Sequence, residues 1–391
     1  MTREERLVEF CREAIRIPSP SGQEKGVAEL MKRKMEEYGF DEVIIDKYGS
    51  VLGTVYGKRP GKTVLLDGHI DHVDVIDAAE WKYDPFAAEV VDGKIYGRGT
   101  SDMKGSDTAM ISAVAHFIED TGKDFAGKIC VSCTVHEECF EGVSSREITR
   151  LCNPDFVIIG EATTTTVKIG QRGRAEIVVE TEGVSCHSSN PEKGVNAVYH
   201  MMAVIEEIKK IVPNEHPILG KGILELTDIV SAPYPGASVL PSLCRATYDR
   251  RTLVGETKEI VLGQVNEAIE RAKAKVPGLK AKCYFAEGSE ACWTGETIKA
   301  ERFFPAWLIE EDSELVQKAM EGLKAAGIDA KISHFAFCTN GSHHCGEAGI
   351  PAIGYGPSLE SLAHTRDEYI EIDQLVKACN GFYNILKGLM V

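Results

Sequence analysis

Acidic and imidazole side chains gather in four short segments of the sequence. The segments are TVLLDGHIDH with His69 and Asp71, GRGTSDMKG with Asp102, ICVSCTVHEE with Glu137 and Glu138, and FVIIGEAT with Glu161. Three of them place these residues directly after a predicted strand, and the fourth places its aspartate just before a predicted helix. The functional crevice of an open α/β sheet lies outside the carboxyl ends of its strands. We therefore expect these side chains to converge at one edge of a sheet.

So many carboxylates in one place have an electrostatic consequence. Like charges a few ångströms apart raise each other's pKa unless a cation neutralises them. A pair of divalent cations would do so, and a mixture of imidazole and carboxylate ligands suits zinc. Two neighbouring metals can polarise a carbonyl group and generate a hydroxide from bound water. Such a site needs one carboxylate to bridge the metals and a second, unligated carboxylate to take the proton of the water.

The elements that would position these residues alternate between helices and strands. The expected ranges are helices at 24–38, 106–118, 311–326 and 372–389, and strands at 51–56, 63–66, 129–135, 156–159, 332–337 and 351–355. This alternation favours a mostly parallel sheet with helices on both faces, which is an α/β fold.

The pattern changes between residues 172 and 289. The expected order there is strand, helix, strand, strand, helix, strand, over residues 174–180, 193–212, 223–230, 244–251, 256–275 and 281–286. This is the order of a split βαβ (ferredoxin-like) sandwich, which is complete in itself. We therefore expect an inserted α+β domain at 172–289 and a discontinuous catalytic domain made of residues 1–171 and 290–391.

The composition narrows the classes of partner. The chain has 391 residues, a hydrophobic fraction of 43% and a formal net charge of −16. Such an acidic chain is a poor partner for nucleic acid or for an anionic membrane. The segment MTREERLVEF lacks the apolar core of a secretory signal, and no apolar run reaches the roughly 18 residues of a membrane span. We expect a cytoplasmic protein.

The twelve cysteines are scattered singly through the chain. Cys130 and Cys133 form a lone CxxC pair inside the predicted strand KICVSCTV. Alternation along a strand places two such side chains on opposite faces, which is poor geometry for a shared metal. We therefore expect buried, reduced cysteines rather than a redox or metal centre.

Taken together, the segments resemble a known family of enzymes. The sequence is similar to the co-catalytic zinc metallopeptidases and amidohydrolases that include acetylornithine deacetylase, succinyl-diaminopimelate desuccinylase, aminoacylase and glutamate carboxypeptidase. The segments that carry the resemblance are GHID, GRGTSDMKG, HEE, GEAT, GVSCHSSNPEKGVNAV, DRRTLVGE, GEAGIPAIGYGP and AHTRDEY, in the family's order. GVSCH, CWTG, FFPAW and CTNG look closest to the subgroup of selenium-metabolism-linked hydrolases.

The resemblance implies that five side chains hold two divalent metal ions: His69 and Glu161 for one ion, His364 and Glu138 for the other, and Asp102 as the bridge between them. Glu137 would be the general base and later the acid that protonates the leaving amine. Asp71 would hydrogen-bond the outer nitrogen of His69 and fix its tautomer. The expected metal is zinc, with cobalt and manganese as alternatives. The family also implies a cis peptide bond after Asp102.

Further residues are implied to act on the substrate. His187, in the inserted domain, would reach the site of the partner subunit and stabilise the tetrahedral oxyanion, an interaction worth roughly 3–4 kcal/mol. Arg251 and Arg172 would bind a substrate carboxylate, and Thr339 and Asn340 would lie beside the substrate. The inserted domain would then be both a lid and the dimerisation surface of a homodimer.

Several positions depart from the family's pattern. His72 follows GHID, Ser238 and Asn340 stand where relatives have other residues, and His343 and His344 add imidazoles. Because the metal set is intact, these departures affect the identity of the substrate rather than catalysis. For the three additional histidines we expect structural or supporting roles.

We expect an enzyme that hydrolyses the amide bond of a small carboxylate-bearing substrate, such as an N-acyl amino acid, an N-carbamoyl compound or a dipeptide. Two alternatives remain open. A metal aminopeptidase would need a free substrate amine and no carboxylate clamp. A non-catalytic metal-binding dimer would have kept the scaffold without turnover, although Glu137 and all five ligands are present.

Overall fold

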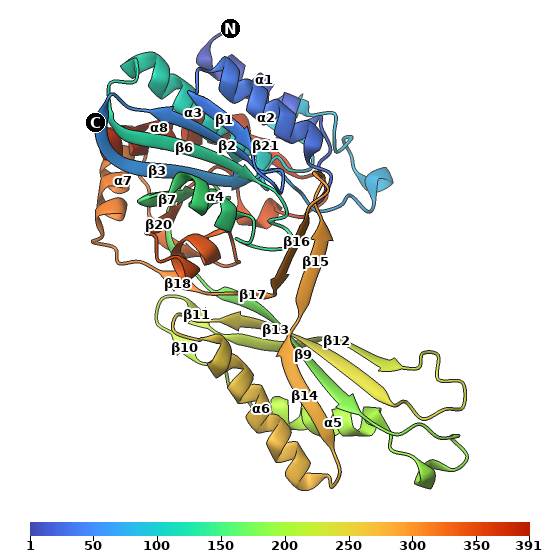
Figure 1. Cartoon of the computed structure of the whole chain (residues 1–391). Coiled ribbons are helices and arrows are strands. Elements are labelled where there is room, and N and C mark those ends of the chain that lie inside the picture. Colours follow the sequence, from blue (N-terminus) through green and yellow to red (C-terminus); the bar gives the residue numbers. More distant parts are fainter. The chain divides into compact units, whose positions relative to one another are not determined.

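The computed structural model describes all 391 residues, and the chain forms two compact units (Figure 1). Unit 1 comprises Met1–Gln171, Ser289–Ala300 and Trp307–Val391, and unit 2 comprises Arg172–Gly288 and Glu301–Ala306. The last six residues of unit 2 include strand β17 (Phe303–Phe304), which pairs with β9 (Gly173–Glu182). The chain therefore returns to unit 2 once more before it completes unit 1.

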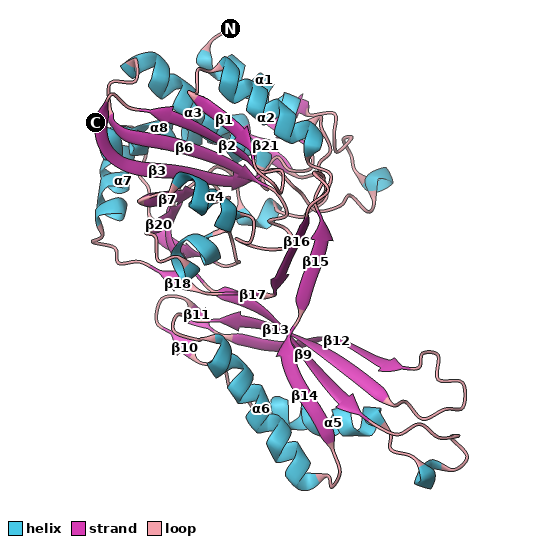
Figure 2. Cartoon of the chain, viewed as in Figure 1, coloured by secondary structure: helices cyan, strands magenta, loops and turns pink.

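Unit 1 is built on a nine-stranded sheet (Figure 2). Its strands are β1 (Glu42–Ile45), β2 (Val51–Tyr56), β3 (Arg59–His69), β6 (Ala126–Thr134), β7 (Phe156–Ile159), β8 (Val167–Gln171), β18 (Trp307–Leu308), β19 (Ile332–Phe335) and β20 (Ala352–Gly354). The order is β1-β2-β6-β3-β7-β20-β8-β18, with β19 beside β8. The central strands β6, β3, β7 and β20 are parallel, whereas β1, β2 and β18 pair antiparallel. The α/β class is confirmed, and the sheet is mixed at its flanks.

Helices cover both faces of this sheet. They are α1 (Arg3–Ile15), α2 (Lys25–Glu37), α3 (Lys104–Thr121), α4 (Ser145–Cys152), α7 (Glu314–Ala325) and α8 (Ile372–Met390), with a π-helical segment η3 (Ser342–Glu347) and short 3-10 turns η1 (Ala78–Glu80) and η4 (Glu360–Leu362). The larger core joins α1, α2, α3, α7 and α8 to one face, and α4 contributes to a smaller core on the other. A small sheet of β4 (Glu89–Val91), β5 (Lys94–Tyr96) and β21 (Tyr369–Glu371) completes unit 1.

The register of the central strands aligns their carboxyl ends. His69, the last residue of β3, pairs with Thr134, the last residue of β6, and Asp67 pairs with Ile159 at the end of β7. Side chains of β3 alternate between the cores, since Val64 and Leu66 belong to the larger one and Leu65 to the smaller. The residues that follow these strand ends therefore emerge at the same edge of the sheet.

Unit 2 has the expected split βαβ order. Its elements are β9, η2 (Pro191–Lys193), α5 (Ala197–Ile208), β10 (Glu215–His216), β11 (Gly220–Lys221), β12 (Ile223–Ala232), β13 (Leu243–Thr252), α6 (Lys258–Lys275) and β14 (Lys280–Phe285). The sheet order is β12-β13-β9-β14, with antiparallel pairing throughout, and α5 and α6 share the core with it. The strands β15 (Glu287–Ala291) and β16 (Thr297–Glu301) form a separate hairpin.

The cysteine expectation is confirmed at the CxxC pair. Cys133 belongs to the larger core and Cys130 to the smaller, so the two side chains lie on opposite faces of β6. All twelve cysteines are free thiols, and eight of them are buried, including Cys130 and Cys133. None of the helices combines the length and the hydropathy that a membrane span requires.

The residue before His69 is a glycine because no side chain fits there. A β-carbon on Gly68 would collide with Asp107 Oδ1 and would lie 2.7 Å from the methyl carbon of Met103. We expect Gly68→Ala to lower the free energy of unfolding by about 1–3 kcal/mol, the usual cost of overpacking. Urea denaturation measures this loss, and Asp107→Ala in the same chain should recover part of it.

The control for this substitution is Gly263 in α6, where an added β-carbon meets no atom within 4 Å. Gly263→Ala should raise the free energy of unfolding by roughly 0.5–1 kcal/mol, because alanine restricts the unfolded chain and favours the helix. An equal effect of both substitutions would contradict the packing argument.

Candidate functional site

Two imidazoles flank one carboxylate at the carboxyl edge of the unit 1 sheet. Asp102 Oδ1 lies 3.1 Å from His69 Nε2, and its Oδ2 lies 3.1 Å from His364 Nε2. Glu161 Oε1 is 3.4 Å from His69 Nε2, and Glu138 Oε2 is 3.0 Å from His364 Nε2. The structure thus brings together all five expected metal ligands as two histidine–glutamate pairs with Asp102 between them.

Each of these side chains is delivered by a different element. His69 ends β3, Glu161 follows β7, Glu138 follows β6, and Asp102 lies two residues before the first residue of α3. His364 comes from the loop between η4 and β21 and has a positive φ of 61°. The peptide bond between Asp102 and Met103 is cis, as expected. His69 is 1% exposed while the side chain of His364 is 53% exposed, so one imidazole is enclosed and the other is open to solvent.

Asp71 organises the turn that carries Glu137 and Glu138. Its Oδ1 accepts a hydrogen bond from the Glu137 backbone N–H at 3.0 Å, and its Oδ2 accepts one from the Glu138 N–H at 3.2 Å. Its Oδ1 also lies 3.5 Å from His69 Nδ1, while the backbone oxygen of Asp71 is 3.0 Å from the same nitrogen. The Ser21 hydroxyl donates to Asp71 Oδ2 at 2.7 Å. Asp71 therefore fixes both the imidazole of His69 and the turn of the two glutamates.

The buried charges strongly perturb each other's protonation. Burial opposes protonation of His69, but hydrogen bonds to Asp102, Asp71 and Glu161 outweigh it and hold its pKa well above the ordinary value. Hydrogen bonds to Asp102 and Glu138 raise the pKa of His364 to about 10. Burial would raise the pKa of Asp102, but its contacts with His364 and His69 lower it well below the ordinary value. Without metal, both imidazoles are therefore cations on either side of a carboxylate.

The pKa values of the two neighbouring glutamates are raised, whereas that of Asp102 is lowered. Burial, followed by repulsion from Asp102, raises the pKa of Glu138 to about 7. Burial and the neighbouring carboxylates Glu161, Glu141 and Glu138 raise the pKa of Glu137 well above its usual range, against the attraction of His69. The cluster thus holds more buried carboxylates than its two imidazoles can neutralise.

The donor set fits a pair of divalent metal ions. One potential ligand atom from each of His69, Asp102 and Glu138 lies within 4.8 Å of the others, and the same holds for His69, Glu137 and Glu161. Glu137 Oε1 and Glu138 Oε1 are buried without a hydrogen-bond partner. Buried carboxylate oxygens without partners are costly, and a metal ion satisfies them. Imidazole and carboxylate ligands in this mixture are typical of zinc and related divalent metals.

The expected oxyanion and carboxylate-binding residues belong to unit 2. His187 is exposed on the loop after β9, and its Nδ1 accepts a hydrogen bond from the Ser189 N–H at 3.1 Å. Arg251 Nε donates to Asp249 Oδ2 at 2.8 Å, and Arg172 Nη1 donates to the Lys221 carbonyl at 2.9 Å. Arg251 remains partly exposed with 28% of its side-chain surface accessible.

Thr339 and Asn340 lie inside unit 1, where their side chains are hydrogen-bonded to other buried residues. The Thr339 hydroxyl donates to Gln171 Oε1 at 2.7 Å. Asn340 Nδ2 donates to Asp67 Oδ2 at 2.9 Å, and its Oδ1 accepts from the Gly142 N–H at 2.8 Å. They are 0% and 2% exposed, respectively. Their contacts therefore fix the start of η3 rather than present donors to solvent.

The three additional histidines have partners of their own. His72 Nε2 accepts from the Ser19 N–H at 2.9 Å, and burial lowers the pKa of His72 to about 4. His343 contacts Glu347 and Thr149 at 2.8 and 3.0 Å, and His344 lies 3.3 Å from Asp67. These contacts anchor the segment at Ser19 and the π-helical segment η3.

Sequence reasoning missed three buried charged groups around the cluster. Lys104 is 0% exposed, and burial lowers its pKa to about 7. Its Nζ donates a hydrogen bond to the Ile17 carbonyl at 2.8 Å. Asp107 is fully buried with both carboxylate oxygens unpaired, and burial raises its pKa well above the usual range. Glu24 accepts from the Gly22 N–H at 2.7 Å. Each stands in a polar stretch of sequence, where nothing signals burial.

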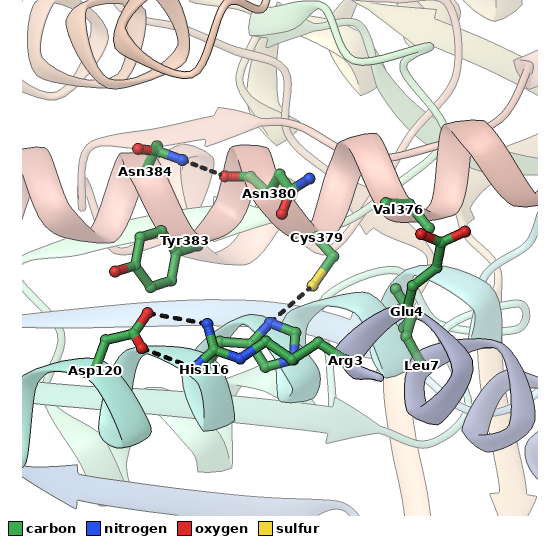
Figure 3. A pocket seen from close by; sticks show the side chains of 10 residues that line it. All are labelled: Arg3, Glu4, Leu7, His116, Asp120, Val376, Cys379, Asn380, Tyr383 and Asn384. Carbon is green, nitrogen blue, oxygen red and sulfur yellow. Dashed lines mark hydrogen bonds and ion pairs between the residues drawn. The ribbon is translucent and has the colours of Figure 1, made fainter. Parts of the chain in front are cut away.

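A separate pocket of about 350 Å³ lies between α1, α3 and α8 (Figure 3). Figure 3 shows Cys379 above His116, with Cys379 Sγ 3.8 Å from His116 Nδ1. Burial raises the pKa of Cys379 to about 12 and lowers that of His116 to about 4. A neutral imidazole beside a protonated thiol is not an activated nucleophile. This pocket shares no residue with the metal-ligand cluster, which consists of the five expected metal ligands His69, Asp102, Glu138, Glu161 and His364.

Comparison with known proteins agrees with this geometry. Residues 65–388 match the model of peptidase family M20/M25/M40. The chain is 36% identical over 386 residues to protein YgeY of Escherichia coli strain K12, covering 96% of this chain and 92% of that protein. It is 27% identical over 384 residues to succinyl-diaminopimelate desuccinylase 2 of Ruegeria sp. strain TM1040, covering 94% and 91%.

Solved structures show the same fold. Aminopeptidase PepT from Bacillus cereus ATCC 10987 superposes with a TM-score of 0.76 at 18% identity and covers 99% of this chain and 98% of its own. The metallo-carboxypeptidase Sso-CP2 from Sulfolobus solfataricus has a TM-score of 0.72 at 19% identity, with 99% of both chains covered. The family match and the metal-ligand cluster together confirm the resemblance found in the sequence: the chain belongs to peptidase family M20/M25/M40 and is a hydrolase of the metallopeptidase and deacylase type.

Proposed function

We propose that this protein hydrolyses the amide bond of a small substrate that carries a free carboxylate, with two divalent metal ions and Glu137 as the general base. The observation that carries the proposal is the position of Asp102, whose two oxygens face two different imidazoles at 3.1 Å each. A carboxylate in this position is suited to bridge two metals, because each oxygen has its own histidine–glutamate pair beside it.

His69 and Glu161 would hold one ion, His364 and Glu138 the other, and Asp102 both. When bound, such a pair of ions, with zinc expected and cobalt or manganese as alternatives, polarises the scissile carbonyl and lowers the pKa of water. Glu137 takes the proton of the attacking water and passes it to the leaving amine. Glu137 is assigned this role because one of its buried oxygens has no hydrogen-bond partner and the group lies beside the two proposed metal positions.

Substrate recognition is proposed for the arginines of unit 2. Arg251 and Arg172 carry guanidinium groups, which bind carboxylates in planar, two-point geometry. The Ruegeria relative is named a desuccinylase, and the N-acyl amino acid class of substrate is proposed from that name. N-carbamoyl compounds and dipeptides have the same carboxylate next to an amide. Thr339 and Asn340 enter this proposal through the loop that they hold in place.

A homodimer through unit 2 is also proposed. Strand β12 is an edge of its sheet, and Ile229 and Val230 on it are 48% and 50% exposed. On α5, Tyr199 and Met202 are 69% and 57% exposed. A long edge strand with exposed apolar side chains is normally covered by a partner. In such a dimer, His187 would donate a hydrogen bond to the oxyanion in the site of the other copy, and unit 2 would act as a lid.

The activity test uses the metal-loaded chain and a panel of amides. We expect hydrolysis of N-acyl amino acids, N-carbamoyl amino acids or dipeptides, and none of amino-acid anilides, because anilides offer no carboxylate to the arginines. Glu137→Gln should lower kcat by about 10²–10⁴, the usual contribution of a general base, with metal content unchanged. Chromatographic detection of the released amine and metal analysis measure both quantities.

The matched control is Glu347→Gln, since Glu347 is paired with Arg146 at 2.6 Å and takes no part in the cluster. A preference for anilides would establish the aminopeptidase alternative. Loss of metal in Glu137→Gln would make Glu137 a ligand instead of the base. No hydrolysis across the whole panel would leave the non-catalytic dimer.

The metal-free protein should lose stability as the pH rises. His364 has a folded pKa of about 10 against roughly 6.5 when unfolded, so its contribution is complete below about pH 6.5 and is lost towards pH 10. Glu138, raised to about 7, acts in the same direction from about pH 4.5 upwards. We therefore expect a lower free energy of unfolding at pH 9 than at pH 6 in the presence of a chelator, measured by urea denaturation.

His364→Gln should flatten this pH dependence. The control is His334→Gln, since the His334 ring hydrogen-bonds the Phe335 carbonyl at 3.2 Å in β19. A chelated protein that is more stable at pH 9 than at pH 6 would contradict the charge arrangement of the cluster.

The dimer is tested by sedimentation velocity. The wild-type chain should sediment as a dimer, and Val230→Asp should shift it to a monomer, because a charge on the covered edge loses its hydration. Val254→Asp, at a position 45% exposed after β13, is the control that should stay dimeric. The Val230→Asp monomer should also lose activity if His187 acts in the partner's site. A wild-type monomer at all concentrations would refute the proposed dimer.

A further inference from the structure

A buried ion pair contacts the backbone next to the metal-ligand cluster, and neither of its two residues has a role in the catalytic assignment. Arg98 Nη1 donates to Glu368 Oε2 at 2.6 Å. Arg98 is 5% exposed and Glu368 is 0% exposed. The Arg98 guanidinium also lies 5.2 Å from the centre of the Trp81 ring. A buried ion pair rarely adds stability compared with apolar packing, so its location calls for another explanation.

The second oxygen of Glu368 holds the backbone on which Asp102 stands. Glu368 Oε1 accepts hydrogen bonds from the Ser101 N–H at 2.7 Å and from the Asp102 N–H at 3.2 Å. The carboxylate thus binds two consecutive amides next to the residue that faces both imidazoles. The backbone at Asp102 cannot move away from Glu368 without breaking these hydrogen bonds.

The segment of residues 97–102, which contains Arg98 and Asp102, is also hydrogen-bonded to the loop of His364. Arg98 Nη1 donates to the Thr365 carbonyl at 3.2 Å, one residue after His364. The Gly97 N–H donates to the Glu368 carbonyl at 2.8 Å, and the Ser101 hydroxyl donates to the Tyr369 carbonyl at 2.7 Å. The Arg98–Glu368 pair therefore joins the segment of Asp102 to the segment of His364, and these contacts set the separation of the two side chains.

The other histidine–glutamate pair has a different support. His69 and Glu161 follow β3 and β7, whose parallel pairing runs up to Asp67 and Ile159. The backbone ladder of the sheet fixes their separation without help from Glu368. His364 instead stands on a loop with a positive φ and more than half of its side chain exposed. The two halves of the cluster therefore differ in what holds them.

We propose that Arg98 and Glu368 are positioning residues that set the affinity of the metal ion held by His364, Glu138 and Asp102, while the ion at His69 and Glu161 depends on them only through Asp102 and therefore more weakly. The inference rests on the proposed two-metal function, and it assigns the loop-borne half of the cluster its own support. Residues that orient metal ligands typically contribute about 10–100-fold to metal affinity.

The test is a titration of the metal-free chain with Co²⁺, followed by visible absorption and by calorimetry. Wild-type protein should bind two ions. Glu368→Gln keeps the size of the side chain but leaves one acceptor oxygen, which cannot accept from both Arg98 and the Ser101 and Asp102 amides. It should weaken one binding step by about 10–100-fold. The spectrum of its remaining ion should match that of His364→Gln and differ from that of His69→Gln.

Arg98→Lys is a second variant that keeps the buried positive charge and should fold even if Glu368→Gln does not. Because lysine lacks the planar guanidinium that lies over the Trp81 ring and fixes the direction of the Nη1 donor, it should weaken the same step to a smaller extent. The matched control is Glu256→Gln, which breaks the buried Arg250–Glu256 pair of unit 2. That pair is 2.8 Å long, against 2.6 Å for Arg98–Glu368, and Glu256 also accepts a hydrogen bond from a backbone amide, that of Leu253. The control should lower stability and leave both cobalt steps unchanged.

The proposal is overturned if both cobalt steps weaken equally in Glu368→Gln and Arg98→Lys, or if neither changes. It is also overturned if Glu256→Gln has the same effect on one step, because the effect would then be general destabilisation. A wild-type chain that binds two cobalt ions and hydrolyses no amide would refute the proposed function, while the cobalt titration would still decide the roles of Arg98 and Glu368.

Discussion

Repulsion among buried carboxylates is the constraint on which the rest of unit 1 depends. Asp71, Asp102, Glu137, Glu138 and Glu161 converge at one edge of the sheet, and the side chain of none of them is more than 12% exposed. The two imidazoles are the only cations in direct contact with them among the ion pairs of the cluster. Charge of this density is stable only if every oxygen has a definite donor or a metal ion. The cost explains why the surrounding backbone is so closely organised.

The protein manages this charge by dividing the carboxylates into two groups. Asp102, Glu138 and Glu161 face imidazole nitrogens, where a metal would lie. Asp71 and Glu368 instead receive backbone N–H groups, each taking two consecutive amides. Amide donors stabilise a carboxylate without adding a mobile charge, so the backbone rather than a metal satisfies these two carboxylates. Two carboxylates, Asp71 and Glu368, therefore hold the backbone that carries the ligands Glu138 and Asp102.

The strand-borne part of this site follows from the sequence pattern, whereas His364 follows only from the family resemblance and the surroundings of Thr339 and Asn340 follow from neither. His69, Glu137 and Glu161 follow apolar strand segments, and parallel strands must end at one edge, so their convergence follows from the pattern. The roles of Thr339 and Asn340 could not be read in this way, since their burial depends on Gln171 and Asp67, which are distant in sequence. Lys104 likewise looks like an ordinary residue at a helix start until α1 places the Ile17 carbonyl beside it. Tertiary partners, which have no local signal, decide these cases.

The same division explains why chemistry and specificity are separable in this chain. The metal-ligand cluster is formed within unit 1. The residues proposed to bind the substrate carboxylate and the oxyanion, Arg251, Arg172 and His187, belong to unit 2. A substitution in unit 2 can change the substrate without disturbing the balance of charge at the cluster, whereas a ligand substitution leaves a buried carboxylate uncompensated. A change to the metal set would therefore cost both stability and catalysis.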